Sequence, residues 1–267
     1  MTGVPSVELL AEPLEDTSLL RFEHLAAIEG FSHAVTTRPW NMAPHRGPQA
    51  DRAGQRRRQV CARLGLPFES LTAPDQVHSP HVLCVSPSDV GAGRDGKETA
   101  IRFCDGLICG LPDVPIMLFS ADCPLILAVE PARRVFGTAH ASWRGTVTHI
   151  AEEMVLQMRR HFGIDPANLS VGISPCAGPG DYEIGDDVRR IIIARITDGE
   201  RFLRPKGNRW RLDLREANAA QLVSVGVDPA KIAVACCSTM TDPRFFSHRR
   251  DGPDTGRFAL IAGFRTV

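Results

Sequence analysis

Residues 115–147 read PIMLFSADCPLILAVEPARRVFGTAHASWRGTV, and this stretch decides the fold class. It contains three short apolar runs, at 115–119, 124–129 and 135–139. Runs of this length, bounded by turn-forming residues, are typical of buried strands and too short for most helices. We therefore expect three buried strands in quick succession.

The segment after these strands predicts a helix that opens at Thr146. Apolar residues recur at near-helical spacing, acidic residues come early, basic residues come late, and Gly163 follows as a stop. The apolar positions are Val147, Ile150, Met154, Met158 and Phe162. Helical spacing of this kind predicts one face packed against a sheet.

Further elements follow with no regular βαβ rhythm. Strands are expected at 169–173, 232–235 and 258–262, and helices at 186–196 and from Asp213 to near Gly226. Upstream, residues 49–64 predict a helix with a solvated arginine face formed by Arg56, Arg57 and Arg58. This mixture favours an α/β (α+β) fold, a mixed β-sheet flanked by helices in one sandwich.

The bulk composition restricts the function classes. Lysine plus arginine equal aspartate plus glutamate at 31 each, which argues against nucleic-acid or membrane-surface partners. The N-terminus has no basic segment followed by an apolar core, and the eight cysteines are scattered, so we expect a cytoplasmic protein with reduced thiols. We expect one domain over 1–267, with 1–29 as an N-terminal extension; the alternative is a boundary near 90–100.

Three segments carry residues suited to chemistry: His78 beside a probable strand, Cys123 between two apolar runs, and His140 at a strand end before a helix. Strand ends that lead into helices often gather ligand groups. Each residue alone also has a structural explanation, as a small buried thiol or a hydrogen-bonded histidine. From the residues themselves the three are candidates only.

Several ordered motifs resemble the family labelled multicopper polyphenol oxidase or laccase-domain proteins. They span roughly residues 30–264 and are Thr36-Thr37-Arg38 with Asn41, Gln76-Val77-His78-Ser79, Ala121-Asp122-Cys123, His140-Ala141-Ser142-Trp143-Arg144-Gly145, Tyr182-Glu183-Ile184-Gly185, Asp213-Leu214, Phe245 to Arg250 and Thr255-Gly256-Arg257. So many motifs in order make the resemblance specific.

The resemblance implies an α/β sandwich, also similar to the catalytic domain of a deamidating bacterial toxin. It implies a purine nucleoside phosphorylase with adenosine deaminase activity, acting on a small purine nucleoside and phosphate; bacterial members are also called peptidoglycan editing factors. The family's metal ligands correspond to His78, Cys123 and His140. Ser142 stands where the family usually has glycine.

Other residues of the motifs are candidates for binding substrate or phosphate. Arg38 and Arg144 lie in the matching motifs, and a guanidinium can hold phosphate through two parallel hydrogen bonds. Asn41, which belongs to the matching motif with Thr36-Thr37-Arg38, is a further candidate. Trp143 could stack on a purine or pack in the core, and Arg249 with Arg250 is interpreted as a solvated charge pair.

Two histidines and one cysteine suit zinc in a three-ligand catalytic site, with copper as the alternative metal. A multicopper laccase needs many histidines, whereas the chain has nine and no His-x-His pair. A metal-free reading makes Cys123 a nucleophile with a histidine base. A non-enzymatic reading makes the metal structural in a cell-wall fidelity factor, and His81 is the nearby residue that could close such a site.

Overall fold

Strand β8, Leu125–Glu130, explains why the central apolar runs are continuous. In the computed structural model, which describes residues 2–266, Leu127 packs into one hydrophobic cluster whereas Ile126 and Ala128 pack into another on the opposite face. Successive side chains of a strand point to opposite faces, so a strand between two cores needs apolar residues throughout. The predicted strands at 115–119, 124–129 and 135–139 are confirmed as β7, Ile116–Ser120, β8, and β9, Val135–His140.

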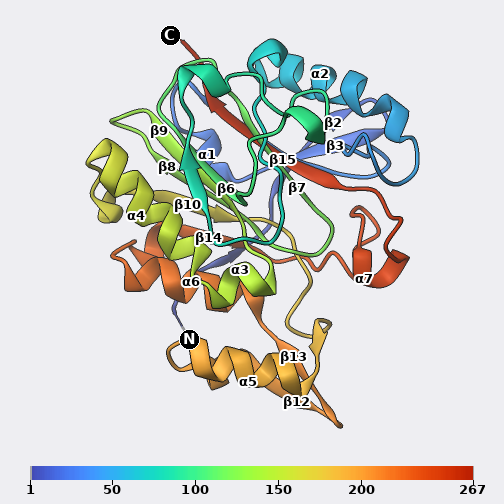
Figure 1. Ribbon diagram of the computed structural model, residues 1–267, viewed down its shortest axis with the longest axis vertical. Coiled ribbons are helices and arrows are strands. Elements are labelled where there is room, and N and C mark those ends of the chain that lie inside the picture. Colours follow the sequence, from blue (N-terminus) through green and yellow to red (C-terminus); the bar gives the residue numbers. More distant parts are fainter. Residues whose placement is uncertain (1, 267) are drawn as a thin grey trace.

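A mixed seven-stranded sheet and an antiparallel five-stranded sheet form the centre of the molecule (Figure 1). The seven-stranded sheet has the spatial order β1 Ser6–Val7, β14 Ile232–Ala235, β10 Ser170–Ile173, β8, β9 Val135–His140, β6 Gly106–Cys109 and β5 Val82–Cys84. The five-stranded sheet has the order β2 Leu10–Leu14, β3 Thr17–Arg21, β4 Phe31–Thr36, β15 Phe258–Phe264 and β7 Ile116–Ser120. One hydrophobic cluster joins their inner faces, with Phe31 and Leu118 from one sheet and Leu107 and Leu127 from the other.

Helices cover the outer faces of both sheets. Helices α4, Ile150–Phe162, and α6, Leu214–Ser224, share a cluster with the seven-stranded sheet, and α2, Ala53–Leu64, shares one with the five-stranded sheet. In Figure 1 α2 lies on the opposite side of the sheets from α4 and α6. The short helix α1, Glu23–Ala26, contacts β4 and β10. The expected mixed sheet flanked by helices is therefore confirmed.

A third, smaller sheet projects from this body at the lower end of Figure 1. It consists of β11 Glu183–Ile184, β13 Arg209–Leu212 and β12 Leu203–Lys206, with helix α5, Asp186–Arg195, against it. These elements have their own hydrophobic cluster, which extends to Val147 and Ala217. Helix α7, His248–Asp251, lies in the chain between β14 and β15.

The prediction of one continuous helix that opens at Thr146 is wrong in two respects: the helix starts earlier, and it is interrupted. Helix α3, Trp143–Val147, begins three residues earlier, because Ser142 caps it by accepting a hydrogen bond from the Gly145 amide at 3.1 Å. The helix then breaks before α4, where His149 adopts a left-handed backbone conformation with φ of 62°. The hydrophobic spacing was preserved across this break, so the sequence pattern did not reveal it.

The solvated arginine face predicted for residues 49–64 is wrong for two of its three residues. Arg56 and Arg57 are buried, whereas Arg58 is exposed. Arg57 donates from Nε and Nη2 to the carbonyl oxygen of Met42, at 3.0 and 2.8 Å. Burial lowers the pKa of Arg57 to about 10. The helix turns this face toward the loop after β4 because guanidinium groups can satisfy the backbone carbonyls there.

The N-terminal residues are integrated into the sheets. Strand β1 pairs with β14, and β3 joins β2 to β4. The assignment of 1–267 to one domain stays a prediction. Within the described residues, every helix is too short or too polar to cross a bilayer.

Candidate metal centre

The β8–β9 hairpin brings Cys123 and His140 to the same end of the seven-stranded sheet. Its register places Leu125 opposite His140. Beyond that pair, the Ala141 amide donates to the carbonyl oxygen of Pro124 at 2.9 Å. Cys123 comes two residues before Leu125, so antiparallel pairing closes the separation of 17 residues between the two candidate ligands.

Asp105 holds the third candidate ligand beside them. This fully buried residue precedes β6, and its carboxylate accepts a hydrogen bond from Nδ1 of His140 at 2.9 Å. The same carboxylate accepts three backbone amides, from Val77 at 3.0 Å, His78 at 3.0 Å and Ser79 at 2.6 Å. One side chain therefore orients the His140 ring and fixes the loop that carries His78.

The donor atoms of His78, Cys123 and His140 all lie within 4.8 Å of one another. The two imidazole ring centroids are 5.2 Å apart. His140 is buried, Cys123 is partly buried and His78 is exposed, so the group lies at the boundary between core and solvent. Within residues 2–266 this is the single group of three or more such donors close enough to share a metal ion. Their role as ligands stays a prediction.

The electrostatics favour an ionised thiol. Burial opposes ionisation of Cys123, but the charge of His140 and hydrogen bonds with both histidines outweigh it and lower the pKa of the thiol to about 7. Burial also disfavours the charged form of His140, yet the Cys123 thiolate and the bond to Asp105 raise the pKa of this imidazole to about 9. Without a metal, His140 therefore keeps its proton near neutral pH and the Cys123 thiol is partly ionised.

The donor set fits zinc. A thiolate and two imidazoles are common zinc ligands, and a carboxylate on the far ring nitrogen of a ligating histidine is a typical supporting contact. Asp105 engages Nδ1 of His140 and leaves Nε2 for a metal. His81 lies outside the donor group and lines a different hollow with Thr148 and His149. Within residues 2–266 the group thus offers three ligands, which leaves a position open.

Zinc affinity should depend on pH, because zinc must displace the proton of His140. The raised pKa of about 9 keeps that proton in place at neutral pH, so affinity should fall as the pH falls below 9. We expect a change of about tenfold per pH unit between pH 7 and 9, since one proton is released. Below pH 7 the Cys123 thiol must also lose its proton, and the slope should steepen. Competition with a chromophoric chelator from pH 6.5 to 9.5 tests this; a flat profile between 7 and 9 would contradict it.

The donor group opens into a cavity of about 420 Å³. This volume lies within the range of small-molecule sites. Phe119 and Tyr182 contribute aromatic side chains to its wall. Burial raises the pKa of Tyr182 to about 12, so its hydroxyl keeps its proton. Six histidine, lysine and arginine side chains also line the wall: His45, Arg46, Lys97, His248, Arg249 and Arg257.

Asp122 joins the donor group to the C-terminal part of the chain. Its carboxylate accepts the Thr239 hydroxyl at 2.6 Å and the Arg249 backbone amide at 2.7 Å. Its backbone φ of 106° is in a region that residues other than glycine rarely adopt. These two bonds hold the strained turn immediately before Cys123.

The three residues expected to bind substrate or phosphate lie outside the cavity wall. Arg38 pairs with Asp251 at 3.3 Å. Arg144 is exposed, with its guanidinium carbon 4.4 Å from the centroid of the Trp143 ring. Asn41 is fully buried, and its amide makes four hydrogen bonds to backbone groups. These four bonds use the whole capacity of the amide, so it has no group left for a ligand.

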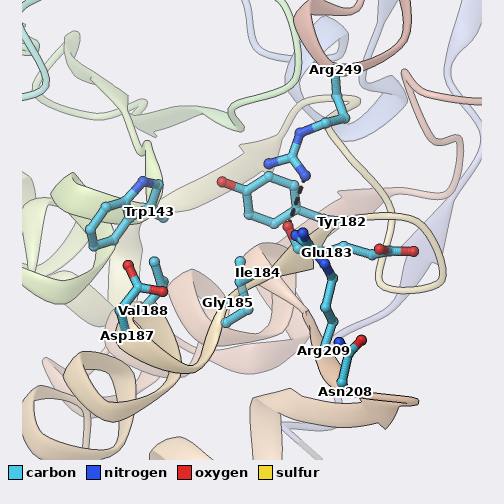
Figure 2. A pocket seen from close by; sticks show the side chains of 10 residues that line it. All are labelled: Trp143, Tyr182, Glu183, Ile184, Gly185, Asp187, Val188, Asn208, Arg209 and Arg249. Atoms are coloured by element: carbon cyan, nitrogen blue, oxygen red, sulfur yellow. Dashed lines mark hydrogen bonds between the residues drawn. The ribbon is translucent and has the colours of Figure 1, made fainter.

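A second cleft, of about 510 Å³, adjoins the cavity (Figure 2). It lies between Trp143 and the small sheet, and Tyr182 and Arg249 line both spaces. Figure 2 shows the Arg249 guanidinium above the Tyr182 ring, at 4.9 Å, and its hydrogen bond of 2.8 Å to the Glu183 carbonyl. Arg249 and Arg250 are both exposed, in agreement with the sequence interpretation, but Arg249 also has these specific contacts. Trp143 is half-buried at this cleft rather than in the main core.

Sequence reasoning missed several residues of the site. Tyr182 and Arg257 lie within motifs that carry the family resemblance, so their positions were available as a signal. Asp105, His45 and Arg46 lie in no such motif. Their roles follow from hydrogen bonds and loop packing between distant segments.

Known proteins resemble this chain over most of its length. The model of the family described as Multi-copper polyphenol oxidoreductase laccase matches residues 27–265. Purine nucleoside phosphorylase YlmD of Geobacillus stearothermophilus is 35% identical over 236 residues, which cover 84% of this chain and 83% of the relative. Adenosine deaminase RL5, from an unknown prokaryotic organism, is 32% identical over 81% of this chain and 84% of its own. The crystal structure of YlmD from Geobacillus stearothermophilus superimposes with a TM-score of 0.88 at 30% identity, covering 97% of this chain and 100% of the other.

Proposed function

The chain belongs to the Multi-copper polyphenol oxidoreductase laccase family, and from that premise we propose that it is a zinc-dependent enzyme of purine nucleosides. Its activity is phosphorolysis of adenosine- and inosine-type nucleosides, with adenosine deamination as a second reaction. Relatives named as a purine nucleoside phosphorylase and an adenosine deaminase support this assignment. The carrying observation is the convergence of three side chains that could hold a metal ion at a cavity of suitable size.

The donor set supports zinc over a multicopper centre. Multicopper oxidases need several copper sites, and residues 2–266 offer one group of three donors. Closed structural zinc sites have four protein ligands, whereas catalytic sites keep a position for water or substrate. When bound, zinc supplies a Lewis acid that activates water near neutral pH or polarises a substrate oxygen.

The chain's own residues divide the remaining work. Cys123 and His140 bind the metal as thiolate and neutral imidazole, and Asp105 keeps the proton on Nδ1 of His140. Phe119 and Tyr182 offer flat faces against which a purine can stack. The basic wall of the cavity attracts phosphate, the co-substrate that distinguishes phosphorolysis from hydrolysis.

A metal-free function has one observation in its favour. The pKa of about 7 for the Cys123 thiol, beside a protonated His140, is typical of an activated cysteine nucleophile. The two functions differ in their need for metal, so one experiment separates them.

We expect purified protein to contain about one zinc per chain. It should release hypoxanthine from inosine only when phosphate is present, and chelation should abolish this release. Metal analysis combined with purine-release and deamination assays, with and without phosphate, tests the proposal. Full activity after complete metal removal would reject the zinc function and favour Cys123 as a nucleophile.

A further inference from the structure

Basic side chains gather on one wall of the cavity beside the metal ligands. This basic cluster consists of His45, Arg46, Lys97 and Arg257. Arg57, buried behind it, lines the adjoining hollow together with His45 and Lys97. The whole chain has 31 basic lysines and arginines and 31 acidic residues, so this concentration of positive charge is local.

Acidic residues do not balance the cluster. Lys97 pairs with Asp75 at 3.0 Å, but across residues 2–266 no carboxylate lies within ion-pair distance of Arg46 or Arg257. Asp122, the acidic residue of the cavity wall, already accepts two hydrogen bonds, at 2.6 and 2.7 Å. The cluster therefore carries net positive charge into the cavity.

The cations are close enough to oppose one another's charge. Burial, followed by repulsion from Arg46, lowers the pKa of Arg257. Burial also lowers the pKa of His45, and the cations around it lower it further, so the positive charge of the cluster comes from Arg46, Lys97 and Arg257. Positive groups held together in this way are stabilised by an anion between them.

The backbone fixes the spacing of the two arginines. The side-chain amide of Asn41 donates to the Arg46 carbonyl at 2.6 Å, and its oxygen accepts the Arg257 backbone amide at 2.9 Å. The two loops touch at Gly47, which has a φ of 82° and whose added Cβ would lie 2.5 Å from the Cα of Gly256. The fold therefore holds the backbone of Arg46 and Arg257 in place before any ligand binds.

The Arg257 side chain is also oriented. Its Nη1 donates to the carbonyls of Thr255 and Gly256, at 2.8 and 2.9 Å. This contact leaves Nε and Nη2 for a ligand. Arg257 lines the same cavity as Cys123 and His140, which puts the cluster next to the donor group.

We propose that the basic cluster is a subsite for a phosphate dianion, adjacent to the metal ligands. Forked guanidinium donors match phosphate oxygens, and a dianion neutralises the unbalanced charge. The subsite replaces Arg38 and Arg144 as the phosphate-binding part of the site. Its role in turnover rests on the proposed function, whereas phosphate binding itself does not.

Arg46→Gln tests the subsite with little disturbance of the folded structure, since within residues 2–266 this side chain makes no hydrogen bond or ion pair. Titration calorimetry with inorganic phosphate, on the purified protein without nucleoside, should show a dissociation constant raised about tenfold to 100-fold. The KM for phosphate in purine release should rise similarly, with the KM for inosine unchanged. Arg160→Gln, an exposed arginine on α4, is the matched control and should behave as wild type.

The phosphate dianion can be free phosphate or the phosphoryl group of a nucleotide. A parallel titration with inosine 5′-monophosphate separates these sources. If the nucleotide binds more tightly than inosine and Arg46→Gln loses this difference, the ligand is the nucleotide. If inosine and free phosphate bind together and their binding free energies add, the ligand is free phosphate. Unchanged binding of both ligands in Arg46→Gln, or loss of phosphate binding in Arg144→Gln instead, overturns the subsite. If purine release is absent but phosphate binding follows the cluster, the proposed function fails and the subsite stands.

Asn41→Ala tests whether the arginine spacing matters. We expect weaker phosphate binding, by about tenfold, because both loops lose their shared partner. The KM for inosine should stay unchanged in protein that still folds, as judged by its melting curve. An equal rise in both constants would assign Asn41 a general structural role and contradict preparation of the arginine pair.

Discussion

Replacing Cys123 by serine is expected to lower zinc affinity by at least about 100-fold and to remove nearly all turnover of purine nucleosides. Loss of an outer partner of a ligand costs about 10- to 100-fold in metal affinity, and loss of the ligand itself should cost more. The thiol has a pKa of about 7 and supplies the negative charge of the donor set, whereas a serine hydroxyl stays neutral. Because Cys123 is only partly buried, the variant should still fold.

Metal content and thermal unfolding check this prediction together. Zinc at about 100 times its dissociation constant should stabilise the wild-type protein by about 2.7 kcal/mol, and the variant should gain far less at the same concentration. Cys236→Ser, which changes an exposed thiol, is the control and should retain both zinc and activity. If Cys123→Ser kept its zinc but lost turnover, the thiol would act on the substrate rather than on the metal.

Replacing Asp105 by asparagine is expected to weaken zinc binding by about 10- to 100-fold, although Asp105 is not itself a proposed ligand. Its Oδ1 accepts from the His140 ring and the His78 amide, and its Oδ2 accepts from the Val77 and Ser79 amides. Asparagine keeps one oxygen acceptor, and its NH₂ group faces the two N–H donors that bonded to the other carboxylate oxygen. Each buried donor left without a partner costs about 1–3 kcal/mol, so stability should fall as well.

The two effects can be separated with a second variant. Asp213 caps α6 by accepting the Glu216 amide at 3.1 Å, and asparagine is also a good cap. Asp213→Asn therefore repeats the chemical change away from the donor group and should leave zinc affinity unchanged. Zinc affinity in Asp105→Asn is measured by chelator competition on folded protein. If Asp105→Asn bound zinc with wild-type affinity, Asp105 would serve stability alone.

Local pattern was sufficient for six of the twelve strands in the two large sheets. The run at 124–129 predicted β8, and the run at 258–262 predicted most of β15, because a strand between two cores must be apolar along its length. Pattern failed where a local hydrogen bond decided the outcome. The Ser142 cap started α3 early, and the left-handed turn at His149 divided the helix without disturbing its hydrophobic spacing.

The sequence motifs identified the candidate ligands, but they did not identify the residues that surround these ligands in the structure. His78, Cys123 and His140 were named from the sequence because the family resemblance marks them. The same reasoning assigned Arg38, Asn41 and Arg144 to substrate, yet none of the three lies in the cavity wall. Arg38 pairs with Asp251, Arg144 lies against Trp143, and Asn41 holds the backbone of Arg46 and Arg257. A motif identifies which residues accompany a function, but it does not specify which atoms they contact.

The sequence by itself determined the strands β7, β8, β9, β10, β14 and β15, the helices that cover the sheets and the chemical character of the donor set. These properties depend on the order of residues within short segments, where periodicity and side-chain chemistry act locally. The tertiary structure alone decided that Asp105 joins two candidate ligands and that Asn41 holds Arg46 beside Arg257. These arrangements depend on strand register and loop packing between segments up to 216 residues apart, for which local sequence carries no energetic signature.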